Sequence, residues 1–231
     1  MQIRVNWSPE VAEKFPDLAV CIGTIMNIRN EKENEQIKSL RKTVYQEVMT
    51  KHNVETLKDN PTVRAFRDFY WKLDIDPTKT RPSGEALLRR VLHGDELPHI
   101  SVVVDAYNLA STRTIMPISG FDADLLNTPF YVRFAKNGET FTGIGMNKSI
   151  SLTDKMLILT DERQALCIYP YRDVDFTRIT MQTRNAMIIV YGVPRIEEQT
   201  LREATKTTLD YIKQVSQGET GTIKVFNASE Q

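Results

Sequence analysis

The sequence predicts an α+β fold in which most helices come first and most strands come later. Apolar residues recur at helical spacing in the first part of the chain, about 1–95. Short apolar segments typical of strands occupy about 96–193, and an amphipathic helix is expected at about 195–217. Neither an internal repeat nor a low-complexity linker divides these parts. We therefore expect one domain over 1–231, long enough to bury a core without disulfides.

The first elements are predicted from alternation and from helix start signals. Apolar and polar residues alternate over 3–7, which indicates a short strand, and Ser-Pro-Glu at 8–10 then begins a helix. A second strand is expected over 18–28. From Glu33 to about His52, apolar residues fall on one face of a charged segment, which predicts a helix.

Two further helices follow in the first part. Asn60-Pro61 begins one of them. Ser83 can cap the next, because Glu85 then lies in its first turn, where an acidic side chain is favourable, and Gly94 can end it.

Short strands are expected in the second part of the chain. Asn137-Gly138 favours a hairpin between two of its segments, 131–135 and 139–144, because both residues tolerate positive φ. After the last strand, Pro194 leads into the final helix, which a short tail follows. The other expected strands are 102–104, 156–160, 165–169 and 186–191.

Composition limits the partners. Lysine plus arginine equals aspartate plus glutamate at 30 each, so an RNA site must be a local patch, and we expect neither DNA nor a membrane as a partner. Cys21 and Cys167 lie far apart in apolar surroundings, as buried free thiols in a reducing cytoplasm do. Without a signal peptide or a long apolar run, the chain is expected to be soluble and cytoplasmic.

Several kinds of chemistry lack support in the sequence. The three histidines have no partners at metal-ligand spacing. The chain has no GxSxG elbow, no phosphate loop ending in Gly-Lys-Ser/Thr and no GxGxxG motif. We therefore expect neither a metal nor an organic cofactor.

Two groups of basic residues can serve an RNA site or the fold. Their guanidinium groups can hold phosphate oxygens, or they can pair with carboxylates such as Asp68 and Glu85 on a solvated helix face. Proline next to Arg81 fixes its loop, which favours the phosphate role there more than at the first group. The first group is Arg64, Arg67 and Lys72, and the second is Lys79, Arg81, Arg89 and Arg90.

The segment LPHISVVVDAYNLAS, 97–111, places a polar cluster after the apolar run 102–104. In a structural interpretation, Asp105 caps a helical turn and Asn108 reaches back to it. In a functional one, these groups lie at the carboxyl end of a strand, where ligands often bind. From the residues alone the structural interpretation is favoured.

A family resemblance changes that balance. VVDAYNLASTRTIMPISGFD resembles, without a gap, the motif VVDxTNYVxxxxGQPxHAFD of the B3/4 editing module in the bacterial phenylalanyl-tRNA synthetase β subunit. Downstream, AKNGETFTGIG and KMLILTDERQALCIYPYRDVDFTRITMQTRNAMIIV are similar to the second half of that module. The resemblance covers about 81–191, and the longer pattern that includes DIDPTKTRPSGEALLRRVL and DAYNLAS is similar to stand-alone B3/4 proteins, which extend the resemblance towards the amino terminus. It implies a β-barrel core with surrounding helices, and a cleft that in the synthetase hydrolyses tyrosine wrongly attached to phenylalanine tRNA.

Each position of the family motif is compared with the residue at the same position in this chain. The motif's threonine is Tyr107 here, and its pocket histidine is Ser119. The segment that supplies a glycine-rich wall in the family is CIYPYRD here, and Asp175 is a candidate for the acidic residue that recognises the tyrosine hydroxyl. The matching positions are Asp105, Asn108, Pro117, Phe121 and Asp122; the residues that replace the wall are Tyr169, Tyr171, Arg172 and Asp173.

The resemblance implies a module that binds aminoacyl-tRNA and hydrolyses mischarged tRNA in trans, which needs a positioned water and donors to the developing oxyanion. Its substrate-binding residues would be Asp105, Tyr107, Asn108, Ser119, Asp122, Arg172, Asp173 and Thr180, and its RNA-binding residues Lys79, Arg81, Arg89 and Arg90. In these roles Asp105 and Asn108 shape the cleft, Ser119 and Thr180 bind the ester or ribose, Arg172 and Asp173 contact the amino acid, and Arg81 meets a phosphate. Tyr107 either lines the pocket or packs in the core.

Two other classes of function stay open. A noncatalytic protein could retain the cleft for an amino acid or another small ligand, and a pocket closed by Tyr107 and Tyr171 would favour it. A protein-interaction domain would instead use the final helix, which predicts an exposed apolar stripe there.

Overall fold

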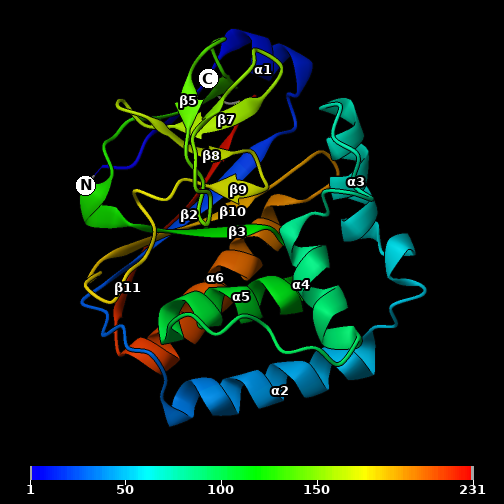
Figure 1. Cartoon of the computed structure of the whole chain (residues 1–231), viewed down its shortest axis with the longest axis vertical. Helices are drawn as coiled ribbons and strands as arrows, with labels where there is room; N and C mark the ends of the chain where they lie inside the picture. Colours follow the sequence, from blue (N-terminus) through cyan, green and yellow to red (C-terminus); the bar gives the residue numbers. More distant parts are fainter. Residues whose placement is uncertain (1, 230–231) are drawn as a thin grey trace.

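The computed structural model describes residues 2–229. Strands gather in one half of the molecule and four of the helices, α2, α4, α5 and α6, in the other half (Figure 1). The α-helices are α1 (Pro9–Lys14), α2 (Glu35–Lys51), α3 (Pro61–Lys72), α4 (Ser83–Leu92), α5 (Val102–Thr114) and α6 (Glu198–Ser216), with 3₁₀ turns η1 (Leu57–Asp59) and η2 (Ala123–Leu125). The strands are β1 (Val5–Trp7), β2 (Ala19–Met26), β3 (Ile118–Asp122), β4 (Phe130–Phe134), β5 (Thr140–Phe141), β6 (Ile150–Ser151), β7 (Leu157–Thr160), β8 (Ala165–Ile168), β9 (Arg172–Asp173), β10 (Ala186–Tyr191) and β11 (Glu219–Asn227).

The strands form mixed sheets, which confirms the α+β class with helices around a sheet core. A five-stranded sheet has the order β1-β4-β7-β8-β9, a four-stranded sheet the order β11-β2-β10-β3, and β5 pairs with β6. The two larger sheets keep separate strand orders and do not close into a barrel within residues 2–229. Buried tyrosines join them: the Tyr169 hydroxyl donates to the carbonyl oxygen of Gly192 at 2.6 Å, and the Tyr191 hydroxyl lies 3.1 Å from the Cys167 sulfur.

The early elements form where the sequence predicts them. The Ser8 hydroxyl accepts from the Val11 amide and begins α1, and Asn34 and Asn60 cap α2 and α3 in the same way. The cap predicted at Ser83 is wrong, because α4 begins with Ser83 itself and Pro82 precedes it without a side-chain cap. Gly94, with a φ of +83°, ends this helix as expected.

The prediction of a strand over 102–104 is wrong, since these residues begin α5. Ser101 caps the helix by accepting from the Val104 amide, and neighbouring helices bury most of α5 on several sides. A helix buried all round shows a continuous apolar run in place of an amphipathic period, so periodicity cannot separate it from a buried strand. Asp105 does help to close the start of the helix, but its carboxylate reaches back to the Ile100 amide at 2.9 Å.

The hairpin predicted at Asn137-Gly138 is also wrong. β4 pairs with β1 and β7, whereas the segment after Gly138 pairs as β5 with β6. The Glu139 carboxylate accepts from the Lys136 amide and from Arg133, so the turn closes on itself and directs the chain away from β4.

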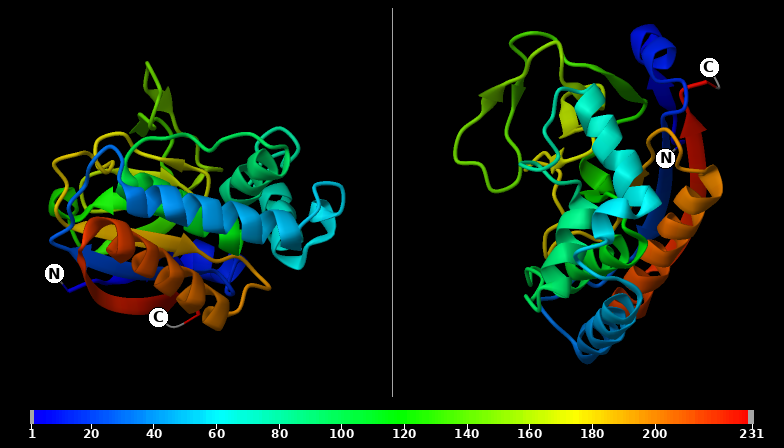
Figure 2. Two further views of the ribbon diagram at one scale, coloured as in Figure 1. Left: turned by 90° about the horizontal axis from the view of Figure 1, so that it is seen from below. Right: turned by 90° about the vertical axis from the view of Figure 1, so that its right-hand side faces the viewer.

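The segment after the final helix forms strand β11, and the final helix is covered. β11 pairs antiparallel with β2, and α6 runs alongside it (Figure 2). The apolar side chains of α6 pack on β2, β10, β11 and α5, and none of the exposed large apolar residues between 2 and 229 lies on α6. This removes the exposed stripe that a protein-interaction domain would present there.

Other sequence-based expectations have mixed outcomes. Cys21 and Cys167 are both free and buried, as expected. No helix between residues 2 and 229 is long and apolar enough to cross a bilayer. The single-domain boundary at 1–231 stays a prediction.

Candidate functional site

Ser119 and Asp173 meet where the two large sheets face each other. Ser119 lies on β3 and Asp173 on β9, each the edge strand of its sheet. The Ser119 hydroxyl donates to Oδ1 of Asp173 at 2.6 Å. Pairing of Ser119 with Ile189 of β10, and of Asp173 with Cys167 of β8, fixes both backbones. Two residues that the sequence motif placed far apart are therefore held in direct contact.

The environment of Asp173 changes its acid strength. Burial raises the pKa of this carboxyl to about 7, although the hydrogen bond from Ser119 lowers it in part. The residue as a whole is half-buried. A carboxyl that is half ionised near neutral pH can accept a proton and return it, as a general base must.

Buried groups behind the pair supply no nucleophile. Burial raises the pKa of the Cys167 thiol, and the charge of Asp173 raises it further. The thiol accepts a hydrogen bond from Tyr191, whose own pKa burial also raises. Cys167 is therefore protonated, as expected for an inert core thiol.

Tyr107 packs beside the pair. A Cβ atom added at Gly120, the residue after Ser119, would lie 2.7 Å from Cε1 of Tyr107 and 2.9 Å from Cδ1 of Ile179. Burial raises the pKa of the Tyr107 phenol, and the charges of Asp173 and Asp105 add to this effect. The ring therefore covers Gly120 on the face of β3 opposite to the Ser119 side chain, because successive residues of a strand point to opposite faces.

We expect Gly120→Ala to destabilise the protein by about 1–3 kcal/mol, because the added methyl group overpacks the contact with Tyr107. Denaturant unfolding measures this change. In a Tyr107→Ala background the cost of Gly120→Ala should fall, though not to zero, since Ile179 remains. An unchanged cost would show that the Tyr107 ring is not what excludes a side chain at this position.

The other motif residues lie in separate hydrogen-bonded groups. Asp105 is buried, and its Oδ2 contacts Arg41 at 3.0 Å and His99, so it ties the start of α5 to α2. Asp122 accepts from the Thr183 hydroxyl at 2.6 Å, and the Thr183 hydroxyl in turn accepts from the Thr180 amide. These carboxylates hold the fold around the pair, and their predicted contact with a ligand stays a prediction.

Asn108 and Arg172 lack such ties. Between residues 2 and 229 no side-chain hydrogen bond of Asn108 is formed; only its carbonyl oxygen accepts, from Thr112. Arg172 is exposed, and its aliphatic carbons lie against the backbone of Gly143. Its guanidinium group has no ion pair within the same residues, and as the strand neighbour of Asp173 it lies on the other face of β9.

The basic group around α4 divides into anchored and free cations. Nε of Arg89 lies 2.6 Å from buried Glu85, and Nε of Arg90 donates to the carbonyl oxygen of Glu96. Lys79 has only a 3.8 Å contact with Asp76, and Arg81 is exposed without an ion pair in the described chain. Arg67 of the first group also pairs with Glu85, as the carboxylate-partner interpretation expects.

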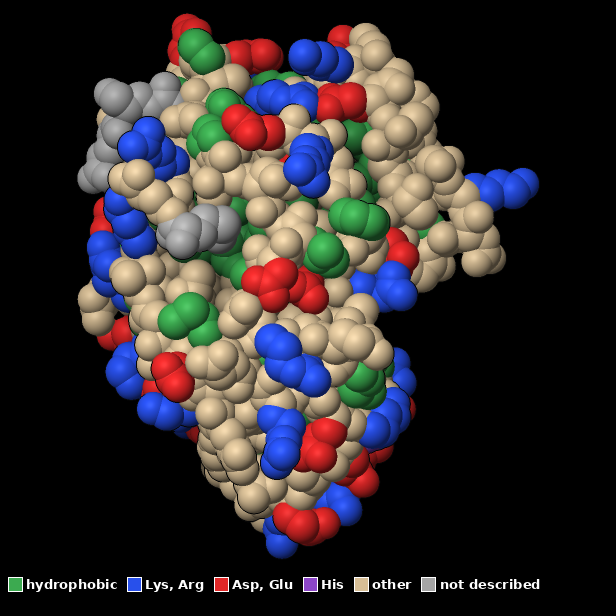
Figure 3. All heavy atoms as spheres, turned by 90° about the vertical axis from the view of Figure 1, so that its left-hand side faces the viewer, with side chains coloured by type: hydrophobic (Ala, Val, Ile, Leu, Met, Phe, Trp, Pro, Cys, Tyr) green, Lys and Arg blue, Asp and Glu red, His purple; other side chains and the backbone are tan. Residues whose placement is uncertain are grey.

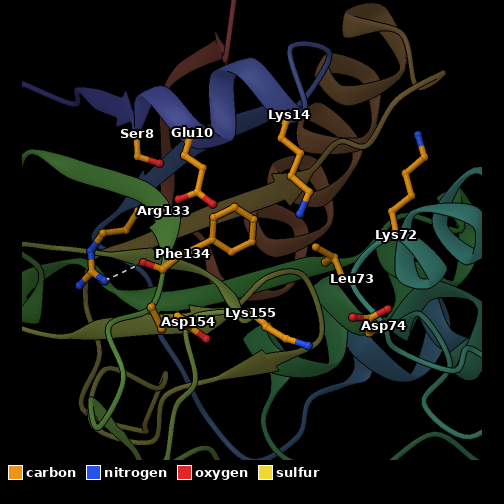
Figure 4. Close-up of a pocket in the computed structure, with 11 residues that line it drawn as sticks. Ser8, Glu10, Lys14, Lys72, Leu73, Asp74, Arg133, Phe134, Asp154 and Lys155 are labelled. Atoms are coloured by element: carbon orange, nitrogen blue, oxygen red, sulfur yellow. Dashed lines mark hydrogen bonds between the residues drawn. The ribbon is translucent and has the colours of Figure 1, made fainter.

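Another hollow lies away from the pair and was not predicted from the sequence. It has a volume of about 600 Å³ and is lined from α1, β4, the end of α3 and the segment before β7. Glu10 and Lys14 point from α1 toward Phe134, and the Lys14 ammonium lies 5.1 Å from the centroid of that ring (Figure 4). Residues between Ser8 and Lys155 line it, and no local pattern in the sequence joins them.

Surface charge gives no dominant field on the face shown in Figure 3. Basic and acidic side chains intermix there, with isolated apolar side chains between them. This agrees with the equal numbers of positive and negative residues. Any anionic partner must be held by a local group of cations.

The family is shown by a comparison with domain models. Residues 65–217 match the B3/4 domain, two thirds of the chain that include both members of the Ser119–Asp173 pair. The chain belongs to the B3/4 domain family. This confirms the resemblance found in the sequence.

The relatives of this B3/4 protein agree with that assignment. It is 33% identical over 81 residues to the phenylalanine–tRNA ligase β subunit of Neisseria gonorrhoeae, and 32% identical over 81 residues to that of Neisseria meningitidis serogroup A. Each match covers 35% of this chain and 10% of the relative, so the chain matches about a tenth of these proteins' length.

A solved structure supports the fold. An N-terminal fragment of the phenylalanyl-tRNA synthetase β subunit from Pyrococcus horikoshii superposes with a TM-score of 0.51 at 14% identity. The match covers 95% of this chain and 50% of the fragment. At this identity the similarity concerns the fold alone.

Proposed function

We propose that this B3/4 protein binds aminoacyl-tRNA and hydrolyses mischarged aminoacyl-tRNA in trans. The observation that carries the proposal is the Ser119–Asp173 hydrogen bond, with a carboxyl that titrates near neutral pH. Both residues lie in the segments that resemble the editing module. The similarity to synthetase β subunits supports a tRNA-related role in general, and tRNA is accordingly the proposed partner.

The chemistry is hydrolysis of an activated ester. Asp173 as carboxylate takes a proton from water while the water oxygen bonds to the ester carbonyl carbon. The carbon–oxygen bond to the ribose then breaks, and the ribose oxygen receives the proton from Asp173. General base catalysis of this kind contributes about 10²- to 10⁴-fold. Ser119 orients the Asp173 carboxyl and can turn its hydroxyl toward the ester.

Binding is assigned to the exposed cations. Arg172 carries an exposed guanidinium group that we assign to the amino acid, and Lys79 and Arg81 are available to phosphate oxygens. Asp105, Asn108, Asp122 and Thr180 shape the surroundings. In this role the protein acts in the cytoplasm, with neither a membrane nor DNA as a partner.

The test is amino acid release from a panel of correctly and wrongly charged tRNAs by the purified protein. We expect selective release from one mischarged class, and a loss of about tenfold or more in Ser119→Ala, which removes a hydrogen bond to a charged group. Ser39→Ala, at an exposed serine of α2, is the matched control and should keep full activity. Release no faster than the uncatalysed rate on every tRNA would refute the deacylase.

One observation favours a second candidate, a noncatalytic protein that binds an amino acid or another small ligand. Ser119 is only 4% exposed, which leaves little room for a large ester beside its hydroxyl, and Tyr171 packs against Tyr70 with ring centroids 6.4 Å apart. Such a protein would bind free amino acids in calorimetry but release none from charged tRNA. The release assay therefore separates the two candidates.

A further inference from the structure

We propose that a surface hollow next to Asp173 is a nucleotide platform, on which Phe176 stacks a base of single-stranded RNA and Arg163 holds its phosphate. The proposal rests on the proposed function and deepens it, because it names how the acceptor end of a charged tRNA is held beside the Ser119–Asp173 pair. Neither residue was singled out by the sequence motifs.

Phe176 is exposed in a way that core packing does not explain. Its exposed fraction is 64%, the highest among the large apolar residues of the described chain. It lies in a turn between β9 and β10 that Asp175 and Arg178 close with an ion pair. The turn therefore presents an aromatic face to solvent on a fixed backbone. Aromatic faces stack nucleic-acid bases of any sequence.

The hollow that Phe176 borders has the size and the charge for a nucleotide. Its volume is about 490 Å³, within the usual range of small-ligand sites. Its two acidic residues are already neutralised, since Glu139 pairs with Arg133 and Asp175 pairs with Arg178. Arg163 is exposed and has no ion pair among residues 2–229.

The remaining lining suits a polar, planar ligand. Thr140, Thr142 and Gln164 add hydroxyl and amide groups that can bind a ribose or a base edge. With the acids neutralised, the free charge of the hollow is the single guanidinium of Arg163. An anionic group such as a phosphate is therefore favoured there, and the exposed ring accounts for a base beside it.

The backbone connects this hollow to Asp173, although neither Ser119 nor Asp173 lines it. The Asp175 amide donates to the carbonyl oxygen of Thr142, and the Ile144 amide donates to that of Asp173, both at 2.9 Å. Phe176 follows Asp173 by three residues, a span of at most about 10 Å between their Cα atoms. An RNA chain with one base stacked on Phe176 would thus bring the next nucleotide, or the ester at its end, close to Asp173.

The experiment measures binding of a short single-stranded oligoribonucleotide that carries no amino acid to the full-length protein. Fluorescence anisotropy follows the binding across a salt series. We expect Phe176→Ala to weaken binding about 5- to 100-fold and Phe176→Tyr to restore it, because a phenol ring also stacks. Arg163→Gln should weaken binding and lower the slope of log affinity against log salt by about 0.7, the value for one phosphate contact on a single strand.

Trp71→Ala is the matched control. This tryptophan on α3 is 56% exposed, so its removal tests whether any exposed aromatic residue gives the effect, and we expect no change in binding. No binding by the wild-type protein, or equal losses in Trp71→Ala and Phe176→Ala, would overturn the platform.

The platform and the deacylase can fail separately. If oligonucleotide binding depends on Phe176 but no charged tRNA is hydrolysed, the platform holds and the deacylase is wrong. If charged tRNA is hydrolysed while Phe176→Ala leaves both oligonucleotide binding and KM unchanged, the platform is wrong and the deacylase stands.

Discussion

Replacing Asp173 with asparagine should lower the rate of amino acid release by about 100-fold or more, the contribution of a positioned general base. Asparagine keeps the shape of the side chain, and its carbonyl oxygen can still accept from the Ser119 hydroxyl, which lies 2.6 Å from Oδ1 in the wild type. The amide cannot take up the proton of the attacking water. Single-turnover hydrolysis of the preferred charged tRNA measures this loss.

The wild-type rate should also depend on pH. Because burial raises the pKa of Asp173 to about 7, the carboxylate fraction, and with it the rate, should increase tenfold per pH unit below pH 7 and level off above it. In Asp173→Asn this step should disappear, leaving the slope of ester hydrolysis by hydroxide. A wild-type profile without a step between about pH 6 and 8 would contradict the assignment of Asp173 as the base.

The free energy of unfolding should fall as the pH rises, whereas the rate of release increases. A carboxyl whose pKa is higher in the folded state binds its proton more tightly there, so this contribution to stability is lost as the pH rises from the ordinary aspartate value to about 7. At pH 8 the folded protein therefore carries the cost of a buried charge, and Asp173→Asn should raise the free energy of unfolding, on the order of 1–2 kcal/mol after allowance for partial exposure. Urea unfolding at pH 5 and pH 8 measures this.

Asp210→Asn on α6 is the control for both effects. Asp210 is an exposed carboxylate that pairs with Lys206, so its loss should leave the release rate and the stability nearly unchanged. Lower activity together with higher stability is typical of a residue kept for function. Loss of both activity and stability in Asp173→Asn would indicate a structural role in its place.

Local sequence signals predicted the elements that have a capping residue at their start or a clear apolar pattern. α2 and α3 have asparagine caps and one apolar face, and β10 is an apolar run of strand length, so all three form as predicted. The prediction at the start of α5 was wrong because neighbouring elements bury this helix on several sides, and its sequence therefore lacks the apolar period that distinguishes a helix. β11 was missed because its pairing with β2 lies far apart in the chain.

The candidate site divides in the same way. The motif resemblance singled out Ser119, Asp173 and Tyr107 together, and the structure brings these three close to one another. The raised pKa of Asp173 depends on burial by both sheets, which no local pattern encodes. Phe176 and Arg163 escaped notice because an exposed aromatic residue is recognisable only when its surroundings are known.

Glu85→Gln should reduce the free energy of unfolding by about 2–4 kcal/mol, below the full range for a broken buried ion pair because its two arginines are each about a fifth exposed. The Glu85 carboxylate is only 1% exposed and accepts from Arg67 on α3 at 2.8 and 2.5 Å and from Arg89 at 2.6 Å. Glutamine leaves two cations facing one neutral amide. Denaturant unfolding at pH 7 measures the loss.

The loss of unfolding free energy in Glu85→Gln should become smaller at acidic pH. Burial acts to raise the pKa of Glu85, but the hydrogen bonds and charges of Arg67 and Arg89 outweigh it and hold the pKa below its usual value. The stabilisation is therefore present above the usual glutamate pKa and disappears as the pH falls through the lower folded value, where wild type and variant should converge. Glu35→Gln, at a glutamate whose side chain is 85% exposed at the start of α2, should cost little at any pH.

The Glu85 ion pairs also bear on RNA binding. The Arg67–Glu85 pair joins α3 to α4, whereas Arg89 pairs with Glu85 within α4, and the loop between the two helices carries Lys79 and Arg81. If that loop holds phosphate oxygens in the proposed function, Glu85→Gln should weaken tRNA binding without removing any contact to RNA, since the cations lose their fixed position. Arg81→Ala should weaken binding with a lower salt slope, whereas Glu85→Gln should weaken it with the slope nearly unchanged. Unaltered tRNA affinity in both variants would place the RNA surface away from α4.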